Sequence, residues 1–194
     1  MKRNKTARLS TSALPWIAIA TLVGVAAALS ACGSLSEPPR KPVSLVPNVD
    51  IPRFMGDWFV IANIPTFLEK GAHNAKDSYR LAPDGTIATV YSHNVDGFTG
   101  PRKTYASTGY VLDKKTNAVW GQQYIWPIKA DYRISYLSSD YQHVVVTRDK
   151  RDYVWIMSRT PTISEAEYQR MVDVVGREGY DVSKLQRVPQ ASGK

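Results

Sequence analysis

The chain has 194 residues, a length that fits one domain with short appendages and excludes a large multidomain enzyme. Hydrophobic residues make up 43% and charged residues 22%, an ordinary globular composition that excludes a wholly disordered chain. The formal net charge is +8, and half of it comes from Lys2, Arg3, Lys5 and Arg8 near the N-terminus. A nucleic-acid-binding domain carries its basic excess in the folded part, so no nucleic-acid partner is expected.

The first 31 residues have the pattern of an export signal. The basic residues precede an apolar stretch over 13–28, which is short for a membrane-spanning helix of about 20 residues. Small residues follow and end in Leu29-Ser30-Ala31-Cys32, which resembles the lipobox of bacterial lipoproteins. We therefore predict a signal peptide over 1–31 and a lipid anchor on Cys32, with an uncleaved N-terminal anchor as the alternative. Because Cys32 is the only cysteine, no internal disulfide can form.

A proline-rich segment follows Cys32. Residues 33–50 contain four prolines and show no sustained hydrophobic period. Proline-rich chains favour extended polyproline geometry, so we expect a lipidated cysteine and tether over 32–50 and a folded domain over 51–194. Alternatively, apolar residues near the end of this segment plug one end of the core: Leu45, Val46 and Val49.

Short strand-like segments follow one another at hairpin spacing from residue 58 onward. Polar turns such as Pro83-Asp84-Gly85 separate them. An antiparallel all-β protein of this kind is an up-and-down barrel or a sandwich, and closure into a barrel removes unpaired edges and leaves room for one small ligand. The eight predicted strands are 58–62, 77–81, 86–93, 104–112, 118–125, 131–137, 143–147 and 153–158.

One helix is predicted after the strands. Ser164 and Glu167 form a capping box, and the next apolar residues repeat at helical spacing. The helix is expected to end at Gly176 or Gly179 and to pack on the outside of the β-structure. Residues 185–188 can add a final short strand. The predicted apolar face consists of Tyr168, Met171, Val172 and Val175.

Several motifs resemble those of lipocalins. Gly56-Asp57-Trp58 is similar to the signature that opens the first lipocalin strand, and the segments 131–141 and 155–161 are similar to later lipocalin motifs. The segments 158–164 and 177–184 resemble bacterial outer-membrane lipocalins, which belong to the same branch as apolipoprotein D. The resemblance covers residues 52–189 and is weakest over 94–129. It implies an eight-stranded antiparallel up-and-down barrel with one C-terminal helix on its outside.

The resemblance also implies roles for individual residues. It places Trp58 at the closed end of the barrel, next to Gly56, with the guanidinium of Arg159 across the indole as a structural latch. Strand side chains alternate between the two faces, so counting from Trp58 and Arg159 along the strands predicts which residues face the interior. These candidate ligand-binding residues are Val60, Ala62, Tyr79, Thr89, Tyr91, Tyr132, Ile134, Tyr136, Trp155 and Met157.

The sequence contains no pattern that indicates catalysis or a metal. His73, His93 and His143 lie in separate segments without the spacing of metal ligands, and there is no nucleophile elbow or phosphate-binding glycine loop. No catalytic residue, metal or cofactor is therefore predicted. Asp77 is the one unusual carboxylate, because it falls near the inward face of its strand.

Together these features predict a lipid-anchored lipocalin in the outer membrane of a Gram-negative bacterium, with the domain facing the periplasm. Gly33 after the cysteine, in place of Asp, favours the outer membrane by resemblance to enteric lipoproteins. The resemblance implies a fatty acid or lysophospholipid as ligand, stored or transported in envelope maintenance, and a homodimer is possible. Two alternatives remain open: a lipocalin-like enzyme acting on a hydrophobic substrate, and a structural lipoprotein whose barrel is filled by side chains.

Overall fold

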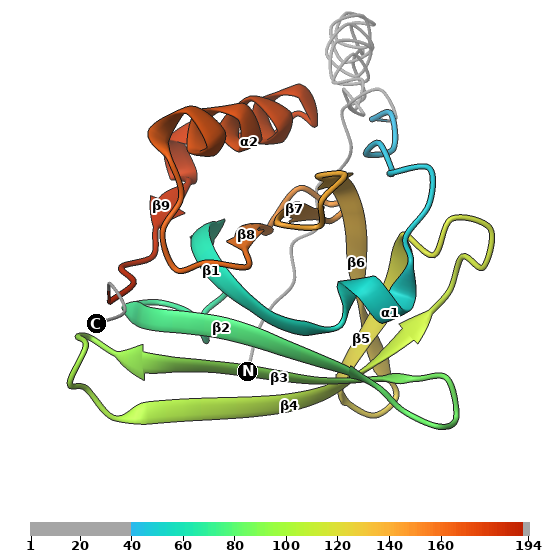
Figure 1. The fold of residues 1–194 in the computed structure, drawn as a ribbon, viewed down its shortest axis with the longest axis horizontal. Coiled ribbons are helices and arrows are strands. Elements are labelled where there is room, and N and C mark those ends of the chain that lie inside the picture. The colour runs from blue at the N-terminus through green and yellow to red at the C-terminus, as the bar shows by residue number, and fades with distance from the viewer. Residues whose placement is uncertain (1–39, 192–194) are drawn as a thin grey trace, which may run out of the picture. The chain divides into compact units, whose positions relative to one another are not determined.

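The computed structural model describes residues 40–191, so the predicted signal peptide and Cys32 lie outside the described residues. Eight antiparallel strands follow one another around a barrel, and β1 pairs with both β8 and β2, which closes it (Figure 1). The predicted barrel is confirmed. The strands are β1 (Gly56–Ile64), β2 (Ala72–Leu81), β3 (Ile87–Val95), β4 (Arg102–Val111), β5 (Val119–Ile125), β6 (Ile128–Leu137), β7 (His143–Thr147) and β8 (Val154–Ser158).

The two ends of the barrel differ. The loops after β1, β3, β5 and β7 lie at one end, which we call the mouth. The opposite, closed end is covered by the short helix α1 (Ile51–Phe54), which the sequence analysis did not predict. Asp50 caps α1 by accepting a hydrogen bond from the Arg53 amide, and a proline occupies the first turn. Phe54 is fully buried, so α1 plugs the barrel with an aromatic ring.

The segment before α1 packs on the barrel. Val49 is fully buried in the core, and its amide donates to the Thr116 carbonyl at 2.8 Å, while the Val46 amide donates to the Ile134 carbonyl at 3.0 Å. The compact unit accordingly begins at Lys41, ten residues before the predicted domain boundary. The alternative in which this segment plugs the core therefore describes the structure better than a tether reaching to residue 50.

Two β-bulges reverse the side-chain alternation on which the predicted inner wall was based. In β1, Val60 pairs with Met157 and Ala62 pairs with Ile156, so the register shifts between them. An extra residue in one strand moves every later side chain to the other face. Val60 therefore lies in the barrel core, whereas Ala62 lies in a second hydrophobic cluster outside the barrel.

A second bulge acts in the same way on β6. The register against β7 shifts between Ile134 and Tyr136. Ile134 belongs to the core of the barrel, and Tyr136 packs against the cluster outside it. The expectation that Ala62 and Tyr136 face the interior is thus corrected, because simple alternation does not continue through a bulge.

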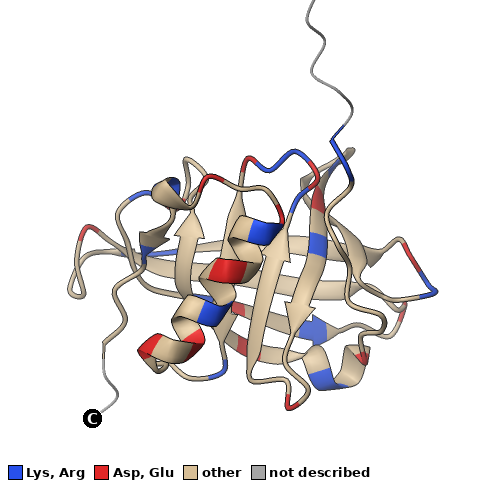
Figure 2. Ribbon diagram, turned by 90° about the horizontal axis from the view of Figure 1, so that it is seen from above, with Lys and Arg blue, Asp and Glu red and all other residues tan. Residues whose placement is uncertain are grey.

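The outer cluster lies beneath the helix α2 (Glu165–Arg177). The Ser164 hydroxyl accepts from the Glu167 amide at 3.2 Å, as the capping box predicted, and Met171 and Val175 are buried against β6, β7 and β8. Figure 2 shows α2 lying across these strands. After the turn η1 (Val182–Lys184), the two-residue strand β9 (Gln186–Arg187) pairs with β1 along the edge opposite β8. The predicted helix on the outside of the barrel is confirmed.

The closed end is held by Trp58 and Arg159. Trp58 is fully buried, and its indole Nε1 donates to the Phe54 carbonyl at 2.9 Å, while the Arg159 guanidinium lies 3.9 Å from the ring. Gly56 has a φ of +99°, and a side chain there would approach Arg159 to 3.3 Å. Arg159 also donates, at 2.8–3.3 Å, to the backbone carbonyls of Arg53, Phe54, Met55, Asp57 and Tyr141.

We expect Trp58 and Arg159 to be energetically coupled. Replacing Trp58 with Ala removes a fully buried indole and should lower the free energy of unfolding by about 3–5 kcal/mol. A double-mutant cycle with Trp58→Leu and Arg159→Ala, measured by urea denaturation, should give a coupling of about 0.5–3 kcal/mol. The control pair is Arg187 over the Tyr168 ring on the surface, for which water screens the cation–π attraction to about 1 kcal/mol or less. Additive effects of Trp58 and Arg159 would contradict the latch.

Candidate functional site

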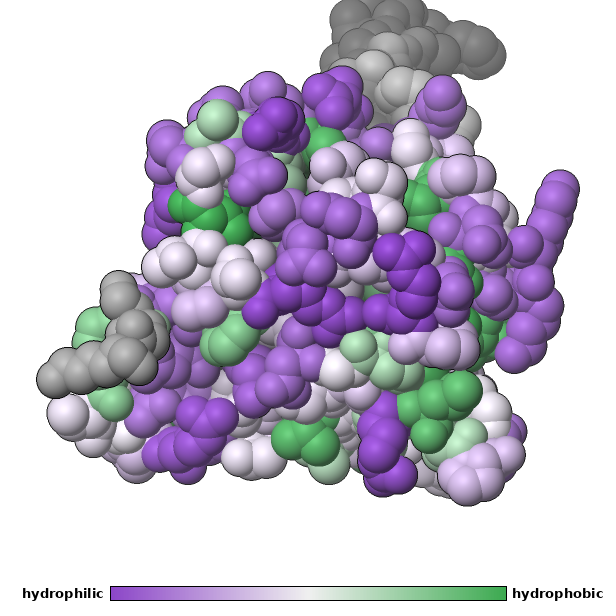
Figure 3. Space-filling view, in the orientation of Figure 1, coloured by the Kyte–Doolittle hydropathy of each residue, from purple (hydrophilic) through white to green (hydrophobic). Residues whose placement is uncertain are grey.

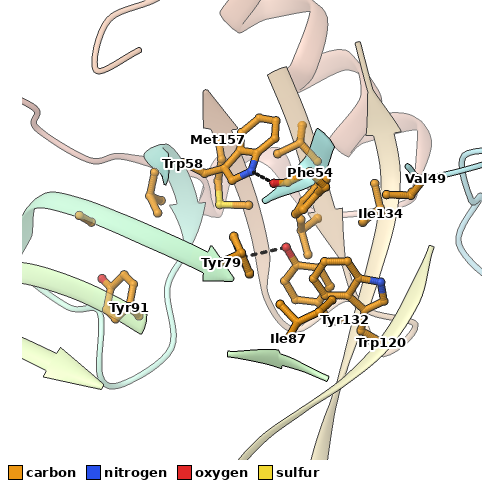
Figure 4. Close-up of a cluster of buried hydrophobic side chains, with 14 of the residues drawn as sticks. Val49, Phe54, Trp58, Tyr79, Ile87, Tyr91, Trp120, Tyr132, Ile134 and Met157 are labelled. Atoms are coloured by element: carbon orange, nitrogen blue, oxygen red, sulfur yellow. Dashed lines mark hydrogen bonds between the residues drawn. The ribbon is translucent and has the colours of Figure 1, made fainter. Parts of the chain in front are cut away.

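A cavity of about 220 Å³ occupies the mouth half of the barrel. The closed half is filled by packed aromatic rings: Trp120 stacks on Tyr132 at 5.0 Å between centroids, and Phe54 contacts both Trp58 and Trp120 (Figure 4). Tyr91 lies apart from these rings in the same view. Side chains therefore fill the closed half of the barrel interior, and the mouth half remains open. The alternative of a completely filled barrel does not describe this structure.

Half of the predicted wall residues line this cavity. They are Tyr79, Tyr91, Tyr132, Trp155 and Met157. Thr89 is buried next to it, where its hydroxyl accepts a hydrogen bond from Gln122 at 3.1 Å, and Val60 and Ile134 are buried in the packed core. With Ala62 and Tyr136 outside the barrel, ligand contact stays a prediction for the five lining residues.

The sequence analysis missed a second set of lining residues. Tyr105 pairs with Tyr91 across β3 and β4, and Gln122 and Tyr124 follow Trp120 at every second position of β5. Counting every second residue from Trp120 along β5 would have predicted that Gln122 and Tyr124 face the interior. The loop after β1 also enters the cavity, and no periodic pattern marks a loop residue. This loop contributes Thr66, Phe67, Leu68 and Glu69.

Glu69 fastens this loop to the barrel wall. One carboxylate oxygen accepts from the Trp155 indole at 2.6 Å, and the other accepts from the Thr66 amide at 2.7 Å. Only 8% of the Glu69 surface is exposed. A negative charge is thereby held at the cavity, close to the aromatic ring that the sequence analysis placed in the wall.

Asp77 is a second buried carboxyl group in the cavity, with 9% of its surface exposed. Burial raises the pKa of Asp77 to about 8, the negative charge of Glu69 adds to this effect, and a hydrogen bond with Tyr79 opposes it. Tyr79 in turn shares a hydrogen bond of 2.9 Å with the Tyr132 hydroxyl. Asp77 therefore holds its proton through most of the neutral pH range in the empty cavity.

The rim of the mouth is apolar. Four large apolar side chains there are 69–83% exposed. They are Phe67 from the loop after β1, and Ile125, Trp126 and Ile128 from the hairpin between β5 and β6. Elsewhere, hydrophilic residues cover most of the face in Figure 3, and apolar residues form separate patches. Three of these four residues fall in the segment 94–129, where the resemblance to lipocalins is weakest.

Two further observations concern membranes and metals. Among residues 40–191, no helix is both long enough and apolar enough to span a bilayer. Within the same residues, no three His, Cys, Asp or Glu side chains are grouped in a way that would hold a metal ion.

Comparison with known proteins agrees with the fold. The Lipocalin-like domain family matches residues 49–190, and the chain belongs to this family. It is 35% identical to the outer membrane lipoprotein Blc of Escherichia coli (strain K12), over 91% of this chain and 97% of that protein. It is 32% identical to temperature-induced lipocalin-1 of Arabidopsis thaliana, over 78% of this chain and 85% of that protein.

Solved structures show the same fold at low sequence identity. Insecticyanin from the tobacco hornworm Manduca sexta matches with a TM-score of 0.61 at 13% identity, over 80% of this chain and 86% of that chain. The cockroach allergen Per a 4 matches with a TM-score of 0.57 at 19% identity, over 78% of this chain and 94% of that chain. These likenesses support the barrel architecture alone.

The buried carboxyl group predicts a pH-dependent stability. Because the pKa of Asp77 is about 8 in the fold and about 3.9 in an unfolded chain, the native state retains a proton that the unfolded state loses between these values. The contribution of Asp77 to stability should fall as pH rises, with a limiting slope of about 1.4 kcal/mol per pH unit. Relative to the wild type, Asp77→Asn should therefore gain stability progressively from pH 5 to pH 8 in urea denaturation.

Asp173→Asn on the exposed side of α2 is the matched control, and its stability profile should stay parallel to that of the wild type. A parallel profile for Asp77→Asn as well would show that Asp77 is ionised in the fold.

Proposed function

We propose that this lipocalin binds one single-chain amphiphile, a fatty acid or a lysophospholipid, at the membrane to which it is anchored. The observation that carries the proposal is the aromatic cavity that opens through an apolar rim. Lipocalins bind hydrophobic ligands, and this cavity offers Tyr91, Tyr105 and Trp155 to a single-chain ligand. Ligand pockets commonly measure about 300–1,000 Å³, so a cavity of about 220 Å³ suits one chain better than a two-chain lipid.

The start of the folded unit supports a location beside the membrane. The Lys41 carbonyl accepts a hydrogen bond of 2.7 Å from Arg151, which lies in the loop after β7 at the mouth. In Figure 2, the described chain begins at the end of the barrel opposite α1. Nine residue steps separate Cys32 from Lys41, and a polyproline chain of nine steps reaches roughly 28 Å at about 3.1 Å per residue.

A lipid on Cys32 would thus hold the mouth, and not the closed end, near the bilayer. The exposed Phe67, Ile125, Trp126 and Ile128 would then face lipid, where aromatic and aliphatic side chains are stabilised. The similarity to an outer membrane lipoprotein supports the outer membrane as this location, with the domain in the periplasm. Uptake of single-chain amphiphiles there would serve storage or transport in envelope maintenance.

Ligand binding is tested first by fluorescence titration of the Cys32→Ser chain. Dodecanoate or a dodecanoyl lysophospholipid should change the Trp155 emission saturably. Burying about a dozen methylenes contributes roughly 10 kcal/mol, and association costs reduce this to an expected Kd near micromolar, about −8 kcal/mol. Ala130→Phe fills the cavity and should abolish binding, whereas Ala88→Phe on the outer face of β3 should leave it intact.

Calorimetry provides the readout that does not depend on tryptophan, and extraction after long incubation identifies the bound molecule. Unchanged amphiphile supports the binding protein, and a chemically altered product would indicate the enzyme alternative. If neither amphiphile binds the folded chain, the proposed function is wrong.

The anchor is tested by fractionation of cells that express the full-length chain. Cleavage before Cys32 and lipidation should place the protein in the membrane fraction, because two or more acyl chains make attachment stable where one chain is marginal. Cys32→Ser should release the processed chain, and Ser34→Ala is the control that should remain bound. A Cys32→Ser chain that stays with the membrane through carbonate washing would rule out the lipid anchor.

A further inference from the structure

Two carboxyl groups in the cavity have no cationic partner. The other charged side chains that line it are paired: Arg148 contacts Asp152 at 3.3 Å, and Asp131 contacts Arg133 at 2.9 Å. Glu69 and Asp77 form no ion pair with any residue in the described part of the chain. Both are more than nine-tenths buried. The unpaired charge of this cavity is therefore negative.

The walls around the two acids also favour a positive charge. Rings from β3, β4, β5 and β8 surround the cavity, and the π-face of an aromatic ring attracts ammonium groups. Tyr91 Oη, Gln122 Oε1 and Arg148 Nε are buried without a hydrogen-bond partner, and all three residues line the cavity, although the Arg148 guanidinium is already paired with Asp152. The Gln122 oxygen can only accept a hydrogen bond, so it suits a donor. Among these aromatic side chains are Tyr91, Tyr105, Tyr124 and Trp155, together with Tyr153 from the loop before β8.

Buried carboxylates without a partner are costly, and a ligand can change that cost in either direction. A carboxylate or phosphate head placed beside Glu69 adds like-charge repulsion in a site that excludes water. A cationic nitrogen supplies the missing partner to Glu69 and allows Asp77 to ionise as well. The sign of the headgroup charge is therefore expected to matter as much as the length of the chain.

We infer that the cavity selects single-chain amphiphiles whose head carries a cationic nitrogen, as a primary or quaternary ammonium held between Glu69 and Asp77. This inference rests on the proposed function and specifies the headgroup that the same cavity takes. The packed rings of Trp58, Trp120 and Tyr132 block the closed half, so the alkyl chain extends toward the apolar rim. Of the two proposed classes, a lysophospholipid can carry such an ammonium group, whereas a fatty acid presents only a carboxylate.

The test compares three probes of equal chain length by calorimetry on the Cys32→Ser chain at pH 7, below their micelle concentrations. Decyltrimethylammonium should bind at least tenfold more tightly than decanoate, with decanol in between. In the double variant Glu69→Gln and Asp77→Asn, the affinities for the cation and the anion should come within about threefold of each other. Asp173→Asn removes one surface charge and should keep the full preference.

A second measurement uses the native residues, so it holds even where the double variant does not fold. Cation binding at pH 7 should release a proton from Asp77, which is detected as a dependence of the binding enthalpy on the ionisation enthalpy of the buffer. Decanol should release none. Asp77→Asn, which keeps the shape of the side chain, should abolish the proton release.

The outcomes separate this inference from the proposed function. If decanol binds but the cation binds no more tightly than decanoate, the headgroup inference is overturned and the amphiphile-binding function stands. If the cation binds more tightly without releasing a proton, the Asp77 part of the site is overturned. If none of the three probes binds the folded chain, the proposed function itself fails.

Discussion

The pairing of β1 with both β8 and β2 is the constraint on which the other features of this molecule depend. It leaves no open edge in the barrel and encloses an interior that eight strands alone do not fill. The closed half is filled by α1 and a set of aromatic rings, and Arg159 holds α1 to the barrel through carbonyls of the 53–57 segment. The mouth half keeps its cavity because nothing comparable fills it.

Because of the bulges in β1 and β6, each of these strands contributes side chains to both the barrel core and the cluster under α2. Before each bulge, Val60 and Ile134 point into the barrel, and after it Ala62 and Tyr136 contribute to the cluster under α2. Without the change of face, apolar side chains in this part of the two strands would point into the mouth half of the barrel. The position of the bulges therefore determines both which side chains pack under α2 and how much space remains in the mouth half of the barrel.

The cavity combines features that oppose one another energetically. Aromatic walls favour an apolar ligand, whereas Glu69 and Asp77 place carboxyl groups in the same water-poor space, which destabilises the empty fold at neutral pH. Glu69 has a structural role, since it fastens the loop after β1 to Trp155. Asp77 fastens no loop and makes a hydrogen bond with Tyr79 inside the barrel, and a buried acid that costs stability in a cavity is typical of a functional site.

Much of the architecture followed from the sequence alone. Strand spacing and the capping box at Ser164 indicated the β-structure and its outer helix, because these features depend on local patterns along the chain. The resemblance to lipocalin motifs indicated the closed barrel and the pair Trp58 and Arg159. Only the tertiary structure showed the bulges that displace Ala62 and Tyr136, the packing of residues 41–50, and the entry of Glu69 into the cavity. A bulge, a docked arm and a loop that folds inward have no periodic signal, since contacts between residues far apart in the chain decide them. For the same reason the sequence placed only Asp77 near the interior, and the fold added Glu69 as a second unpaired acid in the cavity.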